Sequence, residues 1–241
     1  MTLVLLLSFA AFLTSSITAA MGVGGGVVLL ALMAQVVPPA LLIPLHGAAQ
    51  LMSNTNRVLV QRKHINWAYI KPFALGSIVG GVLLTPLALF IPVPVGQITL
   101  GLFILLATWK PAWLSLFTWH PASSGGMTTG LSLVLGATGP LVMSVLPKST
   151  WERQMVVGTH GMAMTIQHGI KVIAFSSLHV NLLEYWHLLL GIGLATLAGN
   201  LLGARLLARI PESKFTVVLN CLLTVLALRL VWQGVSALLS A

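Results

Sequence analysis

Acidic residues are almost missing from this chain of 241 residues. It contains no aspartate and three glutamates, against twelve lysines and arginines. A Ser-His-Asp triad cannot be built without Asp, and Glu152, Glu184 and Glu212 lie in or beside expected loops with no second acid nearby. The sequence therefore argues against an enzyme.

Charged residues of either sign are scarce. They make up 6% of the chain, whereas 57% is hydrophobic; soluble domains carry about 25% charged residues. We expect an all-α polytopic membrane protein embedded in a lipid bilayer, with nothing left over for a soluble domain. The net charge of +9 would suggest nucleic acid in a soluble protein, but here the positive-inside bias explains it and no nucleic-acid partner is expected.

Cysteine is present once, at Cys221, within an apolar run, so no internal disulfide can form. A metal site is not expected either. His160 and His168 are two helical turns apart with no carboxylate near them, whereas a metal needs convergent ligands. We predict neither a metal nor a cofactor.

Long apolar runs dominate what is present. Proline and basic residues separate them into segments at about 2–37, 40–60, 68–91 and 94–118, then about 123–147, 151–176, 183–209 and 213–239. Four segments are thus followed by four more.

The two sets of four match residue by residue. A shift of 114 converts Gly22 to Gly136, His46 to His160 and Arg57 to Lys171, and a shift of 115 converts His64 to His179 and Gly76 to Gly191. A nearly constant shift over several segments indicates an internal duplication. We predict a first membrane repeat over 1–120 and a second over 121–241, within one membrane domain.

Each repeat opens with a segment that a glycine cluster interrupts. The clusters are Gly22-Val23-Gly24-Gly25-Gly26 and Gly136-Ala137-Thr138-Gly139-Pro140. Each glycine weakens a helix by roughly 1 kcal/mol relative to alanine, and irregular backbone at membrane depth requires burial or a wet cavity. We favour two functional breaks, although Gly22 and Gly26 also form a G-x-x-x-G that could serve close helix packing.

The basic residues distinguish two topologies. If each first segment crosses the membrane, the repeats are parallel and the basic residues divide seven to five between the faces. If it dips in and returns, the repeats are inverted and the division is ten to two, with only Lys171 and Arg229 opposite. The second division satisfies the positive-inside rule. We predict inverted repeats, each a re-entrant hairpin plus three transmembrane helices, with both termini outside the cytoplasm, although residues 3–20 are long enough to cross.

The breaks predict an anion site. In the inverted arrangement the two half-helices that follow the breaks start near the midplane, and their N-termini converge with unpaired N–H groups. Since no Arg or Lys lies inside either break, we expect backbone N–H groups, not side-chain charge, to bind the anion. The break residues that we assign to the site are Gly24, Gly25, Gly26, Thr138 and Gly139.

The second segments add polar side chains to this site. His46, Gln50 and Asn54 are spaced four apart and share a helix face, and His160, Met164 and His168 stand at the matching positions with Gln167 alongside. Polar side chains at membrane depth often mark a pathway, and otherwise hydrogen-bond between helices. We assign substrate binding to His46, Gln50, His160 and Gln167.

These features resemble the sulfite exporter TauE/SafE family of membrane permeases. The resemblance extends over nearly the whole chain, through the first glycine break, Arg62-Lys63-His64-Ile65-Asn66-Trp67, the small-residue run 76–81 and the second break. It implies transport of sulfite, thiosulfate, sulfonates or related anions across a bacterial inner membrane. It supplies no ligand residues beyond the glycine breaks.

We therefore expect a secondary transporter for a small sulfur-containing anion, multi-pass in the inner membrane with periplasmic termini. A cation or proton channel that uses the intramembrane histidines is the alternative, and an assembly subunit without transport is a third. A homodimer is compatible with the sequence, which leaves the coupling ion and the direction of transport open.

Overall fold

The computed structural model describes residues 2–110, 120–147, 150–207 and 212–240. In the first half the helices are α1 (Thr2–Met21), α2 (Gly25–Met33), α3 (Pro39–Gln61), η1 (Arg62–His64), α4 (Trp67–Leu89) and α5 (Val93–Trp109). In the second half they are α7 (Pro121–Leu135), α8 (Gly139–Val145), α9 (Arg153–Ser177), η2 (Leu182–Tyr185), α10 (Trp186–Leu207) and α11 (Glu212–Leu239). The described part of the chain contains helices and no strands.

Local sequence signals set these helix boundaries. Proline occupies the first turn of α3, α5 and α7, where its missing N–H costs no hydrogen bond. Asn66 caps α4, because its side chain accepts from the Tyr69 N–H, and Asn181 caps η2 in the same way through Leu183. The predicted segments therefore recur as helices, except that the run ending at 118 stops being helical at Trp109 and residues 111–119 lie outside the described residues.

The order of the elements is the same in both halves. Equivalent helices run in opposite directions where they meet. α3 and α9 pack antiparallel, with Gly47 beside Lys171 and Gly161 beside Arg57. α5 and α11 also pack antiparallel, because Gly101 meets Val231 whereas Trp109 reaches back to Thr224.

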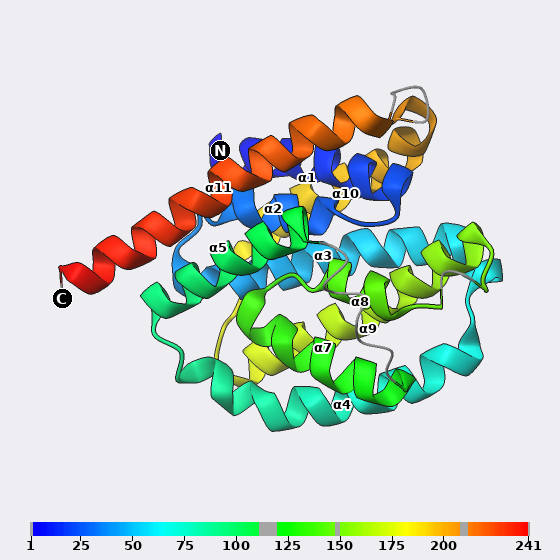
Figure 1. Ribbon diagram of the computed structural model, residues 1–241, viewed down its shortest axis with the longest axis horizontal. Helices are drawn as coiled ribbons and strands as arrows, with labels where there is room; N and C mark the ends of the chain where they lie inside the picture. Colours follow the sequence, from blue (N-terminus) through cyan, green and yellow to red (C-terminus); the bar gives the residue numbers. More distant parts are fainter. Residues whose placement is uncertain (1, 111–119, 148–149, 208–211, 241) are drawn as a thin grey trace.

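The two opening helices pack on the opposite half of the chain. α1 lies along α10, and α7 lies along α4 (Figure 1). Gly76 and Gly80 approach the carbonyl groups of Ala122 and Gly126 so closely that no Cβ would fit, so α4 and α7 run in the same direction in direct backbone contact. The small-residue ladder of α4 thus works as a helix-packing surface.

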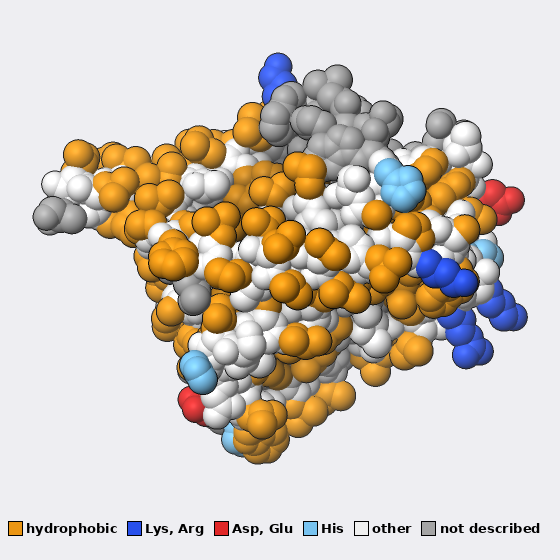
Figure 2. Space-filling view, turned by 90° about the horizontal axis from the view of Figure 1, so that it is seen from below, with side chains coloured by type: hydrophobic (Ala, Val, Ile, Leu, Met, Phe, Trp, Pro, Cys, Tyr) orange, Lys and Arg blue, Asp and Glu red, His pale blue; other side chains and the backbone are white. Residues whose placement is uncertain are grey.

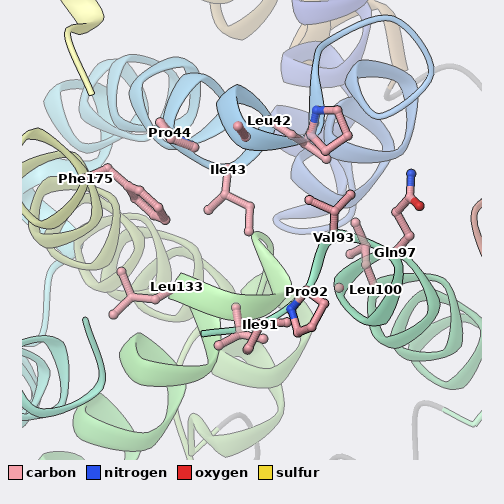
Figure 3. A pocket seen from close by; sticks show the side chains of 14 residues that line it. Leu42, Ile43, Pro44, Ile91, Pro92, Val93, Gln97, Leu100, Leu133 and Phe175 are labelled. Atoms are coloured by element: carbon pink, nitrogen blue, oxygen red, sulfur yellow. The ribbon is translucent and has the colours of Figure 1, made fainter. Parts of the chain in front are cut away.

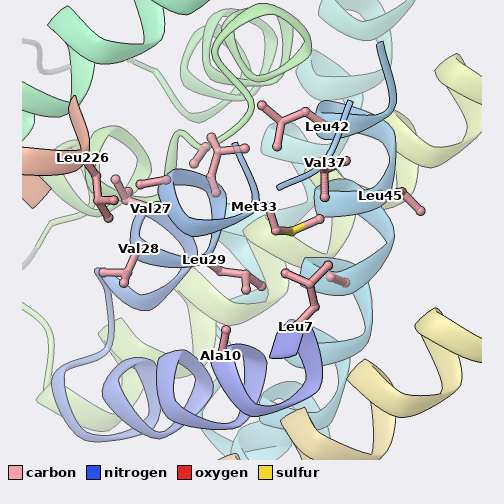
Figure 4. Close-up of a cluster of buried hydrophobic side chains, with 14 of the residues drawn as sticks. Leu7, Ala10, Val27, Val28, Leu29, Met33, Val37, Leu42, Leu45 and Leu226 are labelled. Carbon is pink, nitrogen blue, oxygen red and sulfur yellow. The ribbon is translucent and has the colours of Figure 1, made fainter. Parts of the chain in front are cut away.

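The short helix α2 forms the centre of the larger hydrophobic cluster. Val28, Leu29 and Leu30 are almost inaccessible and pack among side chains of α1, α3 and α11 (Figure 4). A nine-residue helix is too short to cross a bilayer. Burial within protein on all sides explains why it can stand at this depth.

The surface is largely apolar. Within the described residues, three helices are long and apolar enough to cross a membrane, at Thr2–Ala19, Trp67–Leu87 and Leu182–Leu202. Figure 2 shows hydrophobic side chains over most of one face, with several Lys and Arg side chains gathered at one end. These features fit a helical membrane protein.

Two of the basic residues assigned to the membrane faces do not lie there. Arg57 is 5% exposed and Lys171 is fully buried. Lys148 and Arg209 lie outside the described residues. Assigning Arg57 and Lys171 to the faces was wrong, because both side chains turn inward toward the breaks.

Candidate functional site

Each break turns on a glycine in the left-handed region. Gly22 and Gly136, which correspond in the two repeats, both have φ of 82°, and Gly24 has φ of 108°. Gly22 and Gly136 each donate their N–H to the preceding helix, to Thr18 and Ser132 respectively. A side chain at these angles would be strained, so the glycines allow the chain to turn between the two helices of each break.

A buried cation holds the carbonyl group of each of these glycines. Arg57 Nη1 donates to the Gly22 oxygen at 2.9 Å, and Lys171 Nζ donates to the Gly136 oxygen at 2.5 Å. Both pairs follow the 114-residue shift between the repeats. The correspondence between the two halves of the sequence is therefore matched by corresponding hydrogen bonds.

A histidine forms a hydrogen bond with the first turn of each half-helix, α2 and α8. His46 Nε2 meets the Gly26 oxygen at 2.9 Å, and His160 Nε2 meets the Gly139 oxygen at 3.0 Å. A carbonyl oxygen only accepts, so Nε2 carries the hydrogen in both rings. The Nδ1 atoms of both rings are buried and lack a hydrogen-bond partner.

The two breaks and the two stripes enclose one small pocket, which we call the central pocket. Its interior offers about 20 Å3 to the centre of a water-sized sphere, room for about one water molecule. The first repeat lines it with Thr18, Val23, Gly24, Gly26, Val27, His46, Gln50, Asn54 and Arg57, and the second with Ala137, Gly139, Pro140, His160, Met164 and His168.

The central pocket has one cation in its lining and no acid beside it among the described side chains. Arg57 lines it and also donates to Asn54 Oδ1, while its Nε lacks a partner. Among the residues whose side chains are described, Glu152 and Glu184 are the acids, and both are exposed. Two desolvated cations without a carboxylate are unfavourable, which favours an anion at this place.

The structure brings six of the nine predicted site residues to the central pocket. They are Gly24, Gly26, His46, Gln50, Gly139 and His160. A methyl on Gly139 would stand 3.7 Å or more from its neighbours. It would make ordinary van der Waals contacts with Val23, His160 and Met164.

The other three predicted residues lie behind the lining. A Cβ on Gly25 would come within 1.8 Å of the Thr14 carbonyl oxygen, so this glycine serves contact between α1 and α2. The Thr138 hydroxyl donates to Gln167 Oε1 at 3.0 Å, and Gln167 Nε2 donates to Thr128. This chain of hydrogen bonds braces the second break against α7.

The sequence analysis expects backbone N–H groups and no side-chain cation at the site, whereas the structure places Arg57 in the lining of the central pocket and Lys171 at the matching break. The sequence did carry a signal. Arg57 follows Asn54 by three residues and Lys171 follows His168 by three, so each continues its polar stripe by one helical turn.

A second, larger cavity is a half-open groove of about 160 Å3 between the starts of α3 and α5 and the end of α7 (Figure 3). Ile43, Leu133 and Phe175 lie at its inner wall. Ile43 and Phe175 stand one helical turn from the contact between Gly47 and the Lys171 stem. The groove therefore ends close to Lys171, on the side of it away from Arg57.

Within the described residues, no group of three or more His, Cys, Asp or Glu could hold a metal ion. Residues 7–230 match the family described as Sulfite exporter TauE/SafE. No curated protein and no solved structure matches the chain.

Proposed function

Because the chain belongs to the sulfite exporter TauE/SafE family, whose members are transporters and not enzymes, we propose that it is a secondary transporter for a small sulfur-containing oxyanion. Sulfite, thiosulfate and organosulfonates are the candidates. The anion binds in the central pocket, between the two breaks. Its partners are this anion and the lipid bilayer.

The observation that carries the proposal is the pair of buried cations. Arg57 and Lys171 are both removed from water and each contacts only neutral groups. A bound anion supplies the missing negative charge. Charge-assisted hydrogen bonds from a guanidinium to an oxyanion are among the stronger ones in proteins.

The roles of the lining residues follow from their positions. Arg57 presents an unpartnered Nε to the anion, and Gln50 lies over Gly26 with its side-chain oxygen 3.0 Å from where a Cβ would be. Gly24 and Gly26 let the anion approach the backbone N–H groups at the start of α2. Pro140 has no N–H to offer, so we assign the greater share of the donors to the first repeat.

Two inverted repeats, over 1–120 and 121–241, complete the proposal. The antiparallel packing of α3 with α9 and of α5 with α11 supports it, because equivalent helices in inverted repeats must point in opposite directions. The central pocket is too small for an oxyanion in this conformation. Binding therefore requires α3 and α9 to separate, and the groove beside Lys171 is the shorter route inward.

We also place the protein in a bacterial inner membrane with both termini in the periplasm. Once Arg57 and Lys171 are removed from the count, nine basic residues remain on the predicted cytoplasmic face and Arg229 alone on the other. Reporter fusions at the C-terminus test this orientation. Activity of a cytoplasmic reporter alone would contradict it.

A cation or proton channel is disfavoured by the same two residues. A cation that enters the central pocket meets Arg57 directly, and no carboxylate among the described side chains offsets that repulsion.

Flux into proteoliposomes tests the proposed function. We expect saturable sulfite uptake that competing thiosulfate or sulfonate reduces and that an Arg57→Gln variant lacks. Conductance of cations without any anion flux would overturn the proposal in favour of the channel.

A further inference from the structure

Three imidazole rings bring unpartnered ring nitrogens to the central pocket. His46, His160 and His168 all line it, and the Nδ1 atom of each is buried without a partner. In His46 and His160 the Nε2–H donates to a break carbonyl, so a neutral ring leaves Nδ1 as an acceptor. A buried acceptor without a donor is costly, about 1–3 kcal/mol each.

Protonating the rings would give each Nδ1 a hydrogen, but it would cost electrostatic free energy. The titratable groups that interact with His160 are Arg57 on α3 and His168 on its own helix, and those that interact with His168 include Lys171 and His46. From α8, His160 meets the neutral Gly139 carbonyl group. Every ionisable neighbour is therefore a base, and an imidazolium would add a further uncompensated charge.

The central pocket thus combines a cationic donor with neutral acceptors. Arg57 and His160 both line it, and neither Arg57 Nε–H nor His160 Nδ1 has a hydrogen-bond partner. An anion without a hydrogen accepts from Arg57 Nε–H but presents a lone pair to the lone pair of His160 Nδ1. A ligand that satisfies both must carry negative charge and a hydrogen that it can donate.

We infer that the central pocket selects a monoanionic oxyanion that still carries an acidic hydrogen, such as hydrogensulfite, whose hydroxyl donates to His160 Nδ1 while its other oxygens accept from Arg57. This inference rests on the proposed function and narrows its substrate class. Dianionic sulfite and sulfate carry no hydrogen, so one of their oxygen lone pairs would face the lone pair of His160 Nδ1, which is repulsive. An organosulfonate has the charge of hydrogensulfite but lacks the hydroxyl.

One consequence concerns protons. When the surrounding solution is alkaline enough for sulfite to be a dianion, each anion that binds must take one proton from water. Anion binding and proton uptake are then linked one to one, although the histidines themselves stay neutral. The proton is bound to the substrate oxyanion and is released together with it.

Calorimetry on the purified protein in detergent tests this directly. Sulfite is titrated on the alkaline side of its second dissociation, in two buffers of different ionisation enthalpy, with methanesulfonate as the probe that lacks the hydroxyl. We expect uptake of about one proton per bound sulfite and none per methanesulfonate. We also expect sulfite to bind about 10- to 100-fold more tightly on the acid side, the value of one lost hydrogen bond with an unpaired acceptor.

His160→Leu is the variant that removes the Nδ1 acceptor. A glutamine would not serve, because its amide oxygen is itself an acceptor beside the donor. We expect folded His160→Leu, checked by its unfolding temperature, to bind both probes more weakly and to lose the preference for hydrogensulfite over methanesulfonate.

Three results would overturn the inference. They are sulfite binding to the wild type without proton uptake, tighter binding of methanesulfonate than of hydrogensulfite, and a folded His160→Leu variant that keeps the acid preference. If neither sulfite nor methanesulfonate binds at any pH, the proposed function fails as well as the inference. If both bind but one of these three results is found, the inference alone fails.

Discussion

The two breaks share a scaffold and differ in chemistry. Both begin with a glycine at φ of 82° whose carbonyl oxygen accepts from a buried cation. However, Arg57 lines the central pocket, whereas Lys171 is fully buried outside its lining. The two breaks therefore share their backbone geometry, while the charged donor of the pocket lining comes from the first half of the chain alone.

The comparison is sharpest at Gly25 and Gly139, which correspond in the two repeats. We expect Gly25→Ala to remove most of the folded protein, because its Cβ would lie 1.8 Å from the Thr14 oxygen and 2.2 Å from Thr18 Oγ1. Such overpacking against backbone costs about 3 kcal/mol or more. Size-exclusion yield and the midpoint of thermal unfolding measure the loss.

Gly139→Ala is the matched control, since its Cβ meets nothing closer than 3.7 Å. We expect near wild-type stability and weaker anion binding, because the methyl occupies space beside His160. Equal destabilisation by the two substitutions would contradict the asymmetry between the breaks.

A similar contrast applies to the packing glycines Gly76 and Gly191. The Gly76 Cβ would lie 1.8 Å from the Ala122 backbone oxygen, whereas that of Gly191 would meet the Ser8 hydroxyl at 2.6 Å. The Ser8 hydroxyl has no hydrogen-bond partner, so it can rotate away. We expect Gly76→Ala to cost about 3 kcal/mol and Gly191→Ala about 1 kcal/mol, by equilibrium unfolding in mixed micelles. The reverse order would mean that the two helix pairs pack differently in the membrane.

The sequence alone predicted the helices, because proline and polar residues punctuate the apolar runs. It also located both breaks, since only glycine clusters interrupt a run without charge. It could not separate Gly25 from Gly139, because the difference lies in the distance to α1. For the inward turn of Arg57 the sequence offered one signal, its place on the polar stripe three residues after Asn54, against the usual tendency of a long basic side chain near a helix end to reach for the interface.

Lys171 gives the smallest expected effect on stability. We expect Lys171→Met to leave the unliganded protein as stable as the wild type or about 1 kcal/mol more stable, because it removes a buried charge that has no acidic partner. The same variant should bind sulfite about 10-fold more weakly, through loss of a nearby positive charge.

Thermal unfolding with and without sulfite measures both effects at once. Lys171→Arg serves as the control that keeps the charge. A marked drop in the unfolding temperature of Lys171→Met without ligand would show that the Gly136 hydrogen bond outweighs the cost of burying the ammonium group.

The central claim is that Arg57 binds the anion. The most direct test is the dissociation constant for sulfite of the purified wild type, Arg57→Lys and Arg57→Gln, with folding of each checked by its unfolding temperature. We predict that Arg57→Lys stays within about 10-fold of the wild type and that Arg57→Gln is weaker by about 100-fold, as expected when a buried charged partner is removed. Wild-type affinity in folded Arg57→Gln would contradict the account.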